Sequence, residues 1–199
     1  MVTSGAPRCP HCGADLHWGA ERCPYCGSRL MPRSAGGPGS MLRGPFPREL
    51  GIKRQGIVRS SHRLYDGNIL LGTFTQRWPA GVKFSSTRGH RYRTRRKRML
   101  RLMLHWTCGT ALVAWVEQSQ PWIRHYCLHY GGARYSLASV SPMSLVFCLR
   151  DEKETELALI RPAPLLRAPH LTIYAPVPLE VIALAYATSL VLWRQAVTA

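Results

Sequence analysis

Four cysteines near the N-terminus are the residues of this sequence best suited to chemistry. They form two copies of the phrase Cys-Pro-X-Cys-Gly, with Cys9 and Cys12 as the first pair and Cys23 and Cys26 as the second. The stretch between the pairs is long enough for a short hairpin that brings them face to face. Four thiolates at this spacing predict one structural Zn²⁺ with tetrahedral coordination.

Other uses of these cysteines fit the pattern less well. The alternatives are a disulfide pair or a redox Cys-X-X-Cys, but a redox motif would not occur twice in a segment without a βαβ pattern. His11 and His17 could also bind a metal, although four cysteines already complete a tetrahedron. Because a complete tetrahedron leaves no open position, we expect no catalysis at the metal.

The segment from Arg8 to Leu30 resembles the short four-cysteine zinc ribbon found at the N-termini of many bacterial proteins. Both Pro-X-Cys-Gly phrases carry the resemblance, which implies a ribbon domain over residues 8–30. The sequence departs from that pattern at Arg22, where an aromatic residue often stands. With zinc and four thiolates counted, the ribbon is close to neutral, so a protein partner suits it better than nucleic acid.

A second group of candidate residues is basic. The stretch RGHRYRTRRKRMLR, from Arg88 to Arg101, contains eight Lys and Arg residues. Planar guanidinium groups bind phosphate through two hydrogen bonds, so the run is a candidate anion site. The alternative is a solvated strand or loop whose charges prevent edge-to-edge pairing. The candidate anion-binding residues are Arg91, Arg93, Arg95, Arg96, Lys97, Arg98 and Arg101.

The composition as a whole is strongly basic. The 199 residues include 27 Lys and Arg against 10 Asp and Glu, a net charge of +17. Such a charge indicates an anionic partner, either a phospholipid surface or nucleic acid. The sequence contains no P-loop, dinucleotide-binding or metalloprotease motif, so we expect a protein that is not an enzyme.

The remaining cysteines and the N-terminus indicate in which cellular compartment the protein works. Cys108, Cys127 and Cys148 occur singly in apolar stretches and are expected to be buried thiols. The N-terminus lacks the basic and apolar regions of a secretory signal. Both features favour the reducing cytoplasm, with peripheral attachment to a membrane left open.

The elements that must position these residues fall into two parts. Residues 31–50 are rich in Pro and Gly and predict a flexible linker. Residues 51–199 then show strand patterning, and successive hairpins predict a mainly β fold, an antiparallel meander that closes into a barrel. The expected turns are Asp66-Gly67, Cys108-Gly109, Gly131-Gly132 and Asp151 to Glu154.

Residues 178–195 change to a helical pattern. The segment begins at Pro178, has Glu180 in its first turn, and carries no charge from Val181 to Trp193. Apolar residues surround this helix, so protein or lipid must enclose it. The uncharged part spans about 20 Å, less than the ~30 Å of a bilayer core. The sequence therefore favours enclosure by protein over insertion into a membrane.

A β-meander that ends in one apolar helix resembles the phospholipid-scramblase, LURP-one and tubby-like fold. The resemblance spans roughly Ile57 to Ala199 and rests on DGNILLGTF, on YCLHYGGARYSL and on the terminal helix that begins with proline. It implies a barrel wrapped around a central hydrophobic helix, and binding to lipid head groups or other anions. The sequence has neither a calcium-loop pattern nor a cysteine cluster suited to palmitoylation, so the resemblance does not extend to scramblase activity.

Three functions are compatible with these features. The first is a zinc-containing binding or adaptor protein whose basic barrel engages an anionic surface, namely phospholipid head groups. The second is a factor associated with RNA or DNA through the same charges. The third is a protein anchored by a C-terminal transmembrane helix.

Overall fold

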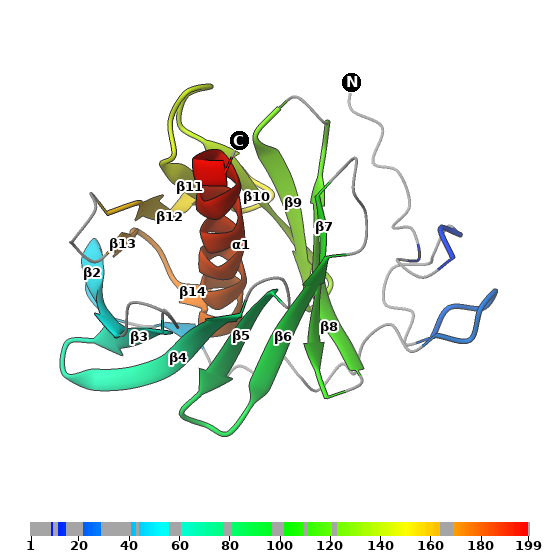
Figure 1. Ribbon diagram of the computed structural model, residues 1–199, viewed down its shortest axis with the longest axis horizontal. Helices are drawn as coiled ribbons and strands as arrows, with labels where there is room; N and C mark the ends of the chain where they lie inside the picture. The colour runs from blue at the N-terminus through cyan, green and yellow to red at the C-terminus, as the bar shows by residue number, and fades with distance from the viewer. Residues whose placement is uncertain are drawn as a thin grey trace.

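Strands account for most of the described chain, and one long helix ends it. The computed structural model describes residues 9, 12–14, 22–28, 41–42, 44–55, 61–77, 81–96, 102–109, 111–120, 123–163 and 169–198, with the backbone alone at 77, 95, 96, 197 and 198. Twelve strands form a closed antiparallel barrel, and helix α1 (Leu179–Thr198) lies inside it (Figure 1). The prediction of a mainly β fold that encloses an apolar C-terminal helix is confirmed.

The barrel is a meander in which consecutive strands pair with each other. Within the described barrel, closure depends on one pairing between strands distant in sequence, β13 with β2, which places Leu171 opposite Leu50. A separate short ladder joins β1 to β14. The strands are β1 (Met41–Leu42), β2 (Arg48–Gln55), β3 (Ser61–Asp66), β4 (Ile69–Arg77), β5 (Gly81–Ser86), β6 (Arg91–Arg96), β7 (Met103–Cys108), β8 (Ala111–Gln118), β9 (His125–Tyr130), β10 (Ala133–Ser139), β11 (Phe147–Arg150), β12 (Glu156–Arg161), β13 (His170–Ile173) and β14 (Val177–Pro178).

The four expected hairpins form, and the turn after β3 lies at Gly67-Asn68, one residue later than expected. Gly131 and Gly132 join β9 to β10 with φ values of 60° and 84°, which a two-residue turn needs and which glycine adopts without strain. Between β11 and β12, the Asp151 carboxylate accepts hydrogen bonds from the backbone N–H groups of Lys153 and Thr155. Local chemistry of this kind sets the order of the strands.

The second part of the chain begins earlier than the expected boundary at residue 51. β1 pairs with β14 immediately before the helix, and Leu42 is buried. β2 starts at Arg48, inside the stretch that its Pro and Gly content predicts to be a linker. The reason is that both strands depend on partners more than 120 residues away, Pro178 and Ile173, which a local composition cannot reveal.

The helix is buried on all sides up to its last turns. The residues from Val181 to Ser189 have no exposed surface at all. Two polar residues in this stretch satisfy their hydroxyl groups within the helix, because Thr188 donates to the carbonyl of Leu184 and Ser189 to that of Ala185. Within the described residues, no helix combines the length and the apolar character that crossing a membrane requires.

Two polar contacts fix the helix inside the barrel. His62 Nδ1 of β3 and the hydroxyl of Tyr186 lie 2.5 Å apart in the interior. Near the C-terminal end of the helix, the indole Nε1 of Trp193 donates to the carbonyl of Leu145 at 2.7 Å. Burial, and then the nearby charge of Arg54, lowers the pKa of His62 from 6.5 to about 4.

Truncation tests the position of the boundary. Removal of residues 1–40 leaves every described barrel strand intact, so we expect this variant to keep a cooperative thermal transition. Removal of residues 1–50 deletes β1 and the part of β2 that pairs with β13, so the barrel cannot close and the transition should disappear. Circular dichroism melting distinguishes the two. A cooperative melt after removal of residues 1–50 would show that β13–β2 closure is dispensable.

The buried histidine predicts how stability depends on pH. The folded state holds His62 neutral, so its contribution to the free energy of unfolding is complete above pH 6.5. Up to about 3 kcal/mol of this free energy is lost as the pH falls toward 4. We expect the melting temperature to fall between pH 6.5 and pH 4, and to fall less in His62→Gln. The exposed His170 provides the matched control, because His170→Gln should retain the slope of the wild type.

Candidate metal centre and basic face

The four cysteines of the N-terminal motif converge in the structure. The Sγ atoms of Cys9, Cys12, Cys23 and Cys26 all lie within 4.8 Å of one another. The closest pairs cross between the two motifs, with 3.6 Å from Cys9 to Cys26 and 3.6 Å from Cys12 to Cys23. Cys9 and Cys23 are buried, whereas Cys12 and Cys26 are exposed.

Both motifs fold into the same hydrogen-bonded loop. In the first, Gly13 N donates to the carbonyl of Cys9, and in the second Gly27 N donates to that of Cys23. Each glycine has a positive φ, 79° at Gly13 and 66° at Gly27, which turns the chain back after the second cysteine of its pair. The repeated phrase thus encodes two copies of one ligand-bearing loop.

This geometry suits a metal ion better than a disulfide. Metal–sulfur bonds of about 2.3 Å in a tetrahedron separate the sulfur atoms by roughly 3.8 Å, close to the spacings found here. A disulfide requires about 2.05 Å, far below 3.6 Å. The cluster is therefore compatible with one metal ion held by four thiolates. His11 and His17 lie outside the described residues.

The thiols have unequal proton affinities. The side chain and then the backbone of Ser28 lower the pKa of Cys26 from 9.0 to about 6. At Cys12 the Ala14 backbone acts in the same direction, but desolvation and the neighbouring thiols outweigh it and raise the pKa to about 12. Four thiols this close cannot all ionise alone, so a bound cation is what would allow it.

Metal content tests the cluster directly. We expect purified protein to contain about one equivalent of metal by elemental analysis, and Cys9→Ser with Cys23→Ser to lose it, since two buried ligands are removed. Cys127→Ser with Cys148→Ser is the matched control and should keep the metal. Full metal content in a variant without the four N-terminal cysteines would contradict the assignment.

The basic candidates are placed only in part. Arg91 and Arg93 project from the outer face of β6, because the alternate residues Tyr92 and Thr94 are buried inside the barrel. Arg95 and Arg96 belong to β6 by their backbone. Lys97, Arg98 and Arg101 lie outside the described residues, so their role as anion ligands stays a prediction.

The outer face of β2 to β6 extends this basic run across the barrel. Register places Lys53, Arg63, Thr73, Ser85 and Arg91 opposite one another in a single row. The next row places Gln55, Ser61, Thr75, Lys83 and Arg93 in the same way. These rows contain cations and small hydroxyl or amide side chains, and no acid. We call Lys53, Arg63, Lys83, Arg91 and Arg93 the basic face.

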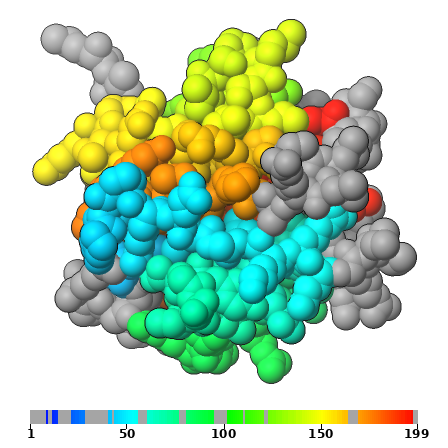
Figure 2. All heavy atoms as spheres, turned by 90° about the vertical axis from the view of Figure 1, so that its left-hand side faces the viewer, coloured from blue at the N-terminus to red at the C-terminus, as the bar shows by residue number. Residues whose placement is uncertain are grey.

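Charge is distributed asymmetrically around the barrel. Figure 2 looks onto β2, β3 and β4, which form one continuous band of the surface. Between residues 48 and 94 the described side chains include eight bases and two acids, and one acid, Asp66, pairs with Arg48 at 3.1 Å. Between residues 123 and 163 they include five bases and four acids. Among the described side chains of these two regions, the excess positive charge therefore belongs to the β2–β6 side.

The sequence analysis missed Lys53, Arg63 and Lys83. Arg63 and Lys83 are single cations between buried residues of their own strands, and Lys53 follows the buried Ile52. That alternation is a local signal that these side chains face outward. Their gathering into two rows depends on the pairing register, which no single strand encodes.

A polar cluster on the outside of β8 to β10 also escaped the motif search. The Ser119 hydroxyl lies 2.5 Å from His125 Nδ1 and 3.7 Å from Cys127 Sγ, and Arg134 Nη2 donates to Cys127 Sγ at 3.0 Å. Burial, and then the charge of Arg134, lowers the pKa of His125. Cys127 is only 3% exposed, so its thiol is not accessible, whereas Ser119 is exposed.

The remaining isolated cysteines are partly as expected. Cys148 is buried, as is Cys127, whereas Cys108 is half-buried. All three are free thiols.

No family model, curated protein or solved structure matches this chain. The functional conclusions therefore depend on the metal cluster, the basic face and their chemistry.

Proposed function

We propose that this is a non-enzymatic binding protein that carries one structural zinc ion and uses the basic face of its barrel to engage an anionic phospholipid surface. Such a protein works in the cytoplasm or at the membrane that it binds. A protein partner for the zinc-bearing segment completes the adaptor role.

The like-charged pairs on the barrel carry the proposal. Lys53 lies directly opposite Arg63, and Lys83 lies directly opposite Arg93. Like charges in such positions destabilise a sheet by about 0.2–1 kcal/mol per pair. Solubility alone does not require them, because the net charge is already +17. An anionic ligand that neutralises both members of each pair would turn this cost into binding energy.

Lipid head groups suit this surface better than nucleic acid. Proteins that bind single strands stack bases on exposed aromatic rings. Among the described outward-facing side chains of β2 to β6, Tyr65 offers a ring, and Lys53 Nζ already lies 5.1 Å over it. The β3–β4 hairpin also exposes Ile69, at 68%, which can enter a lipid interface. Serine and threonine hydroxyls between the cations add donors for phosphate oxygens.

The architecture supports the same proposal. A closed barrel around a C-terminal apolar helix is what the resemblance to the scramblase, LURP-one and tubby-like fold implies. That resemblance also implies recognition of lipid head groups. The Cys127 thiol is buried and accepts a hydrogen bond from Arg134, so it is not available as a nucleophile.

Zinc is the metal proposed for the four-cysteine cluster. Four thiolates in a tetrahedron suit zinc or iron. The two short loops, with a hydrogen-bonded glycine after each cysteine pair, match the ribbon that the sequence resembles, so a structural zinc ion is favoured. Elemental analysis separates the two metals, and an iron–thiolate centre would also colour the protein. A coloured protein with one equivalent of iron would refute zinc.

Binding to vesicles tests the basic face. Arg63→Gln with Lys83→Gln removes two cations, each worth about 1 kcal/mol near an anionic membrane, so we expect binding to phosphatidylserine-containing vesicles to weaken about 30-fold. The control, Lys153→Gln with Arg161→Gln, removes two exposed cations from the β11–β12 side and should change binding less than threefold. Because the first variant relieves both like-charged pairs, its melting temperature should equal or exceed that of the wild type.

Competition distinguishes lipid from nucleic acid. At physiological salt, anionic vesicles should retain the protein in the presence of an equal phosphate concentration of single-stranded RNA. Displacement by RNA, with the same dependence on Arg63 and Lys83, would favour the nucleic-acid function. Equal effects of the two double variants would show that the basic face is an ordinary solvated surface.

A further inference from the structure

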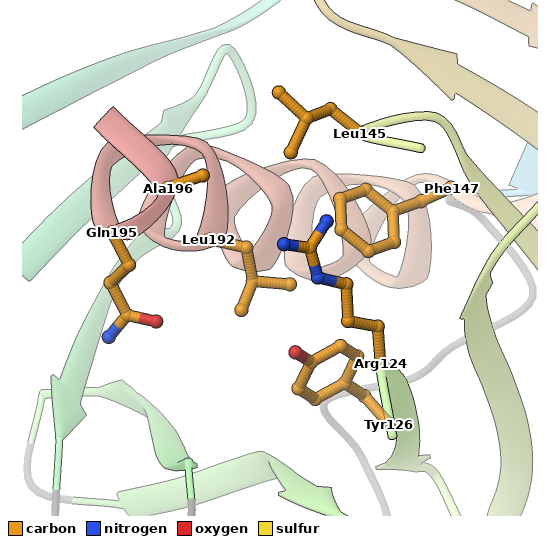
Figure 3. Close-up of a pocket in the computed structure, with 7 residues that line it drawn as sticks. All are labelled: Arg124, Tyr126, Leu145, Phe147, Leu192, Gln195 and Ala196. Carbon is orange, nitrogen blue, oxygen red and sulfur yellow. The ribbon is translucent and has the colours of Figure 1, made fainter. Parts of the chain in front are cut away.

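A pocket opens at the end of the barrel where the helix terminates. It has a volume of about 210 Å³ and lies between the last turns of α1 and the beginnings of β9 and β11 (Figure 3). Leu145, Phe147 and Leu192 supply its apolar surface. Arg124, Tyr126 and Gln195 supply its polar groups. Neither the metal cluster nor the basic face shares any of these residues.

The apolar walls are fixed before any ligand arrives. Phe147 is 1% exposed and packs edge-on against Tyr126, with ring centroids 6.4 Å apart. The backbone of Leu145 is held by the indole of Trp193 at 2.7 Å. A pocket with such walls needs little reorganisation, which lowers the free-energy cost of binding.

The polar groups converge on the same space. Figure 3 shows the Arg124 guanidinium and the Tyr126 hydroxyl directed toward Leu192. Arg124 Nη1 donates to the carbonyl of Ser144 at 3.2 Å, which orients the guanidinium and leaves further N–H donors. Burial raises the pKa of Tyr126, so this side chain stays a neutral hydroxyl donor. Among the described residues, those that line the pocket include no carboxylate.

We propose that this pocket binds a small amphiphilic anion, a carboxylate attached to a short apolar chain. Arg124 pairs with the carboxylate, the Tyr126 hydroxyl donates a hydrogen bond to it, and the apolar chain lies against Phe147 and Leu192. An apolar cavity of about 150 Å³ holds benzene, so this pocket accommodates roughly eight non-hydrogen atoms. Hexanoate has that size. The proposal does not depend on the function of the basic face.

Ligand-observed NMR with the full-length protein tests the pocket, with hexanoate as the probe and hexanol and hexylammonium as matched compounds. We expect hexanoate to bind with a Kd on the order of 1 mM and at least tenfold more tightly than either compound. Arg124→Gln should weaken hexanoate binding at least tenfold, because a buried carboxylate needs its cation. The control Arg161→Gln removes an exposed arginine elsewhere and should leave it unchanged.

A blocking variant distinguishes binding in the pocket from binding to the basic face. Ala196 lines the pocket but is exposed, so Ala196→Phe can fill the space without disturbing the core. We expect this variant to lose hexanoate binding while its thermal transition matches the wild type. Unchanged binding in Ala196→Phe would overturn the proposal, and so would equal affinity for hexanol and hexanoate. Should Arg124→Gln fail to fold, Arg124→Lys keeps the charge and should retain the preference for hexanoate over hexanol.

Discussion

The part of α1 from Val181 to Trp193 carries no charge, so its apolar faces must be covered, and the other elements of this barrel depend on meeting that condition. The part of α1 from Val181 to Ser189 is completely buried, so strands must surround it on every side. A closed barrel achieves this and leaves no strand edge unpaired. Closure depends on β13 meeting β2, and the contacts of His62 and Trp193 hold the helix in register.

Because the helix fills the interior, binding must occur outside the barrel or at its ends. The outer face is available for this, since alternate residues of each strand point away from the core. On β2 to β6 these positions carry Lys53, Arg63, Lys83, Arg91 and Arg93. At the end of the barrel, a pocket remains beside the last turns of the helix, and Arg124 and Tyr126 reach the space beside Leu192. Both proposed sites thus follow from where the helix is and where it ends.

The metal cluster follows a different physical principle. A segment of about twenty residues cannot bury enough apolar surface to fold alone, so a bound metal ion would supply the free energy that it needs. Its two loops need only local hydrogen bonds, such as those of Gly13 and Gly27, to present their cysteines. The barrel is stabilised by hydrophobic burial around α1, and its described core includes no metal ligand set. The stability of the N-terminal segment and that of the barrel can therefore be tested separately.

The sequence by itself determined the features that depend on neighbouring residues. Cysteine spacing identified the ligands, glycine and aspartate marked the hairpin turns, and the absence of charge after Glu180 indicated an enclosed helix. Only the tertiary structure decided that β1 and β2 begin inside the predicted linker, that Lys53 and Arg91 share a row, and that Arg124 and Gln195 line one pocket. The physical reason is the distance along the chain over which the stabilising interactions act. Turns and ligand loops are closed by local hydrogen bonds, whereas strand register and pocket walls are set by barrel closure, which couples residues far apart in the chain.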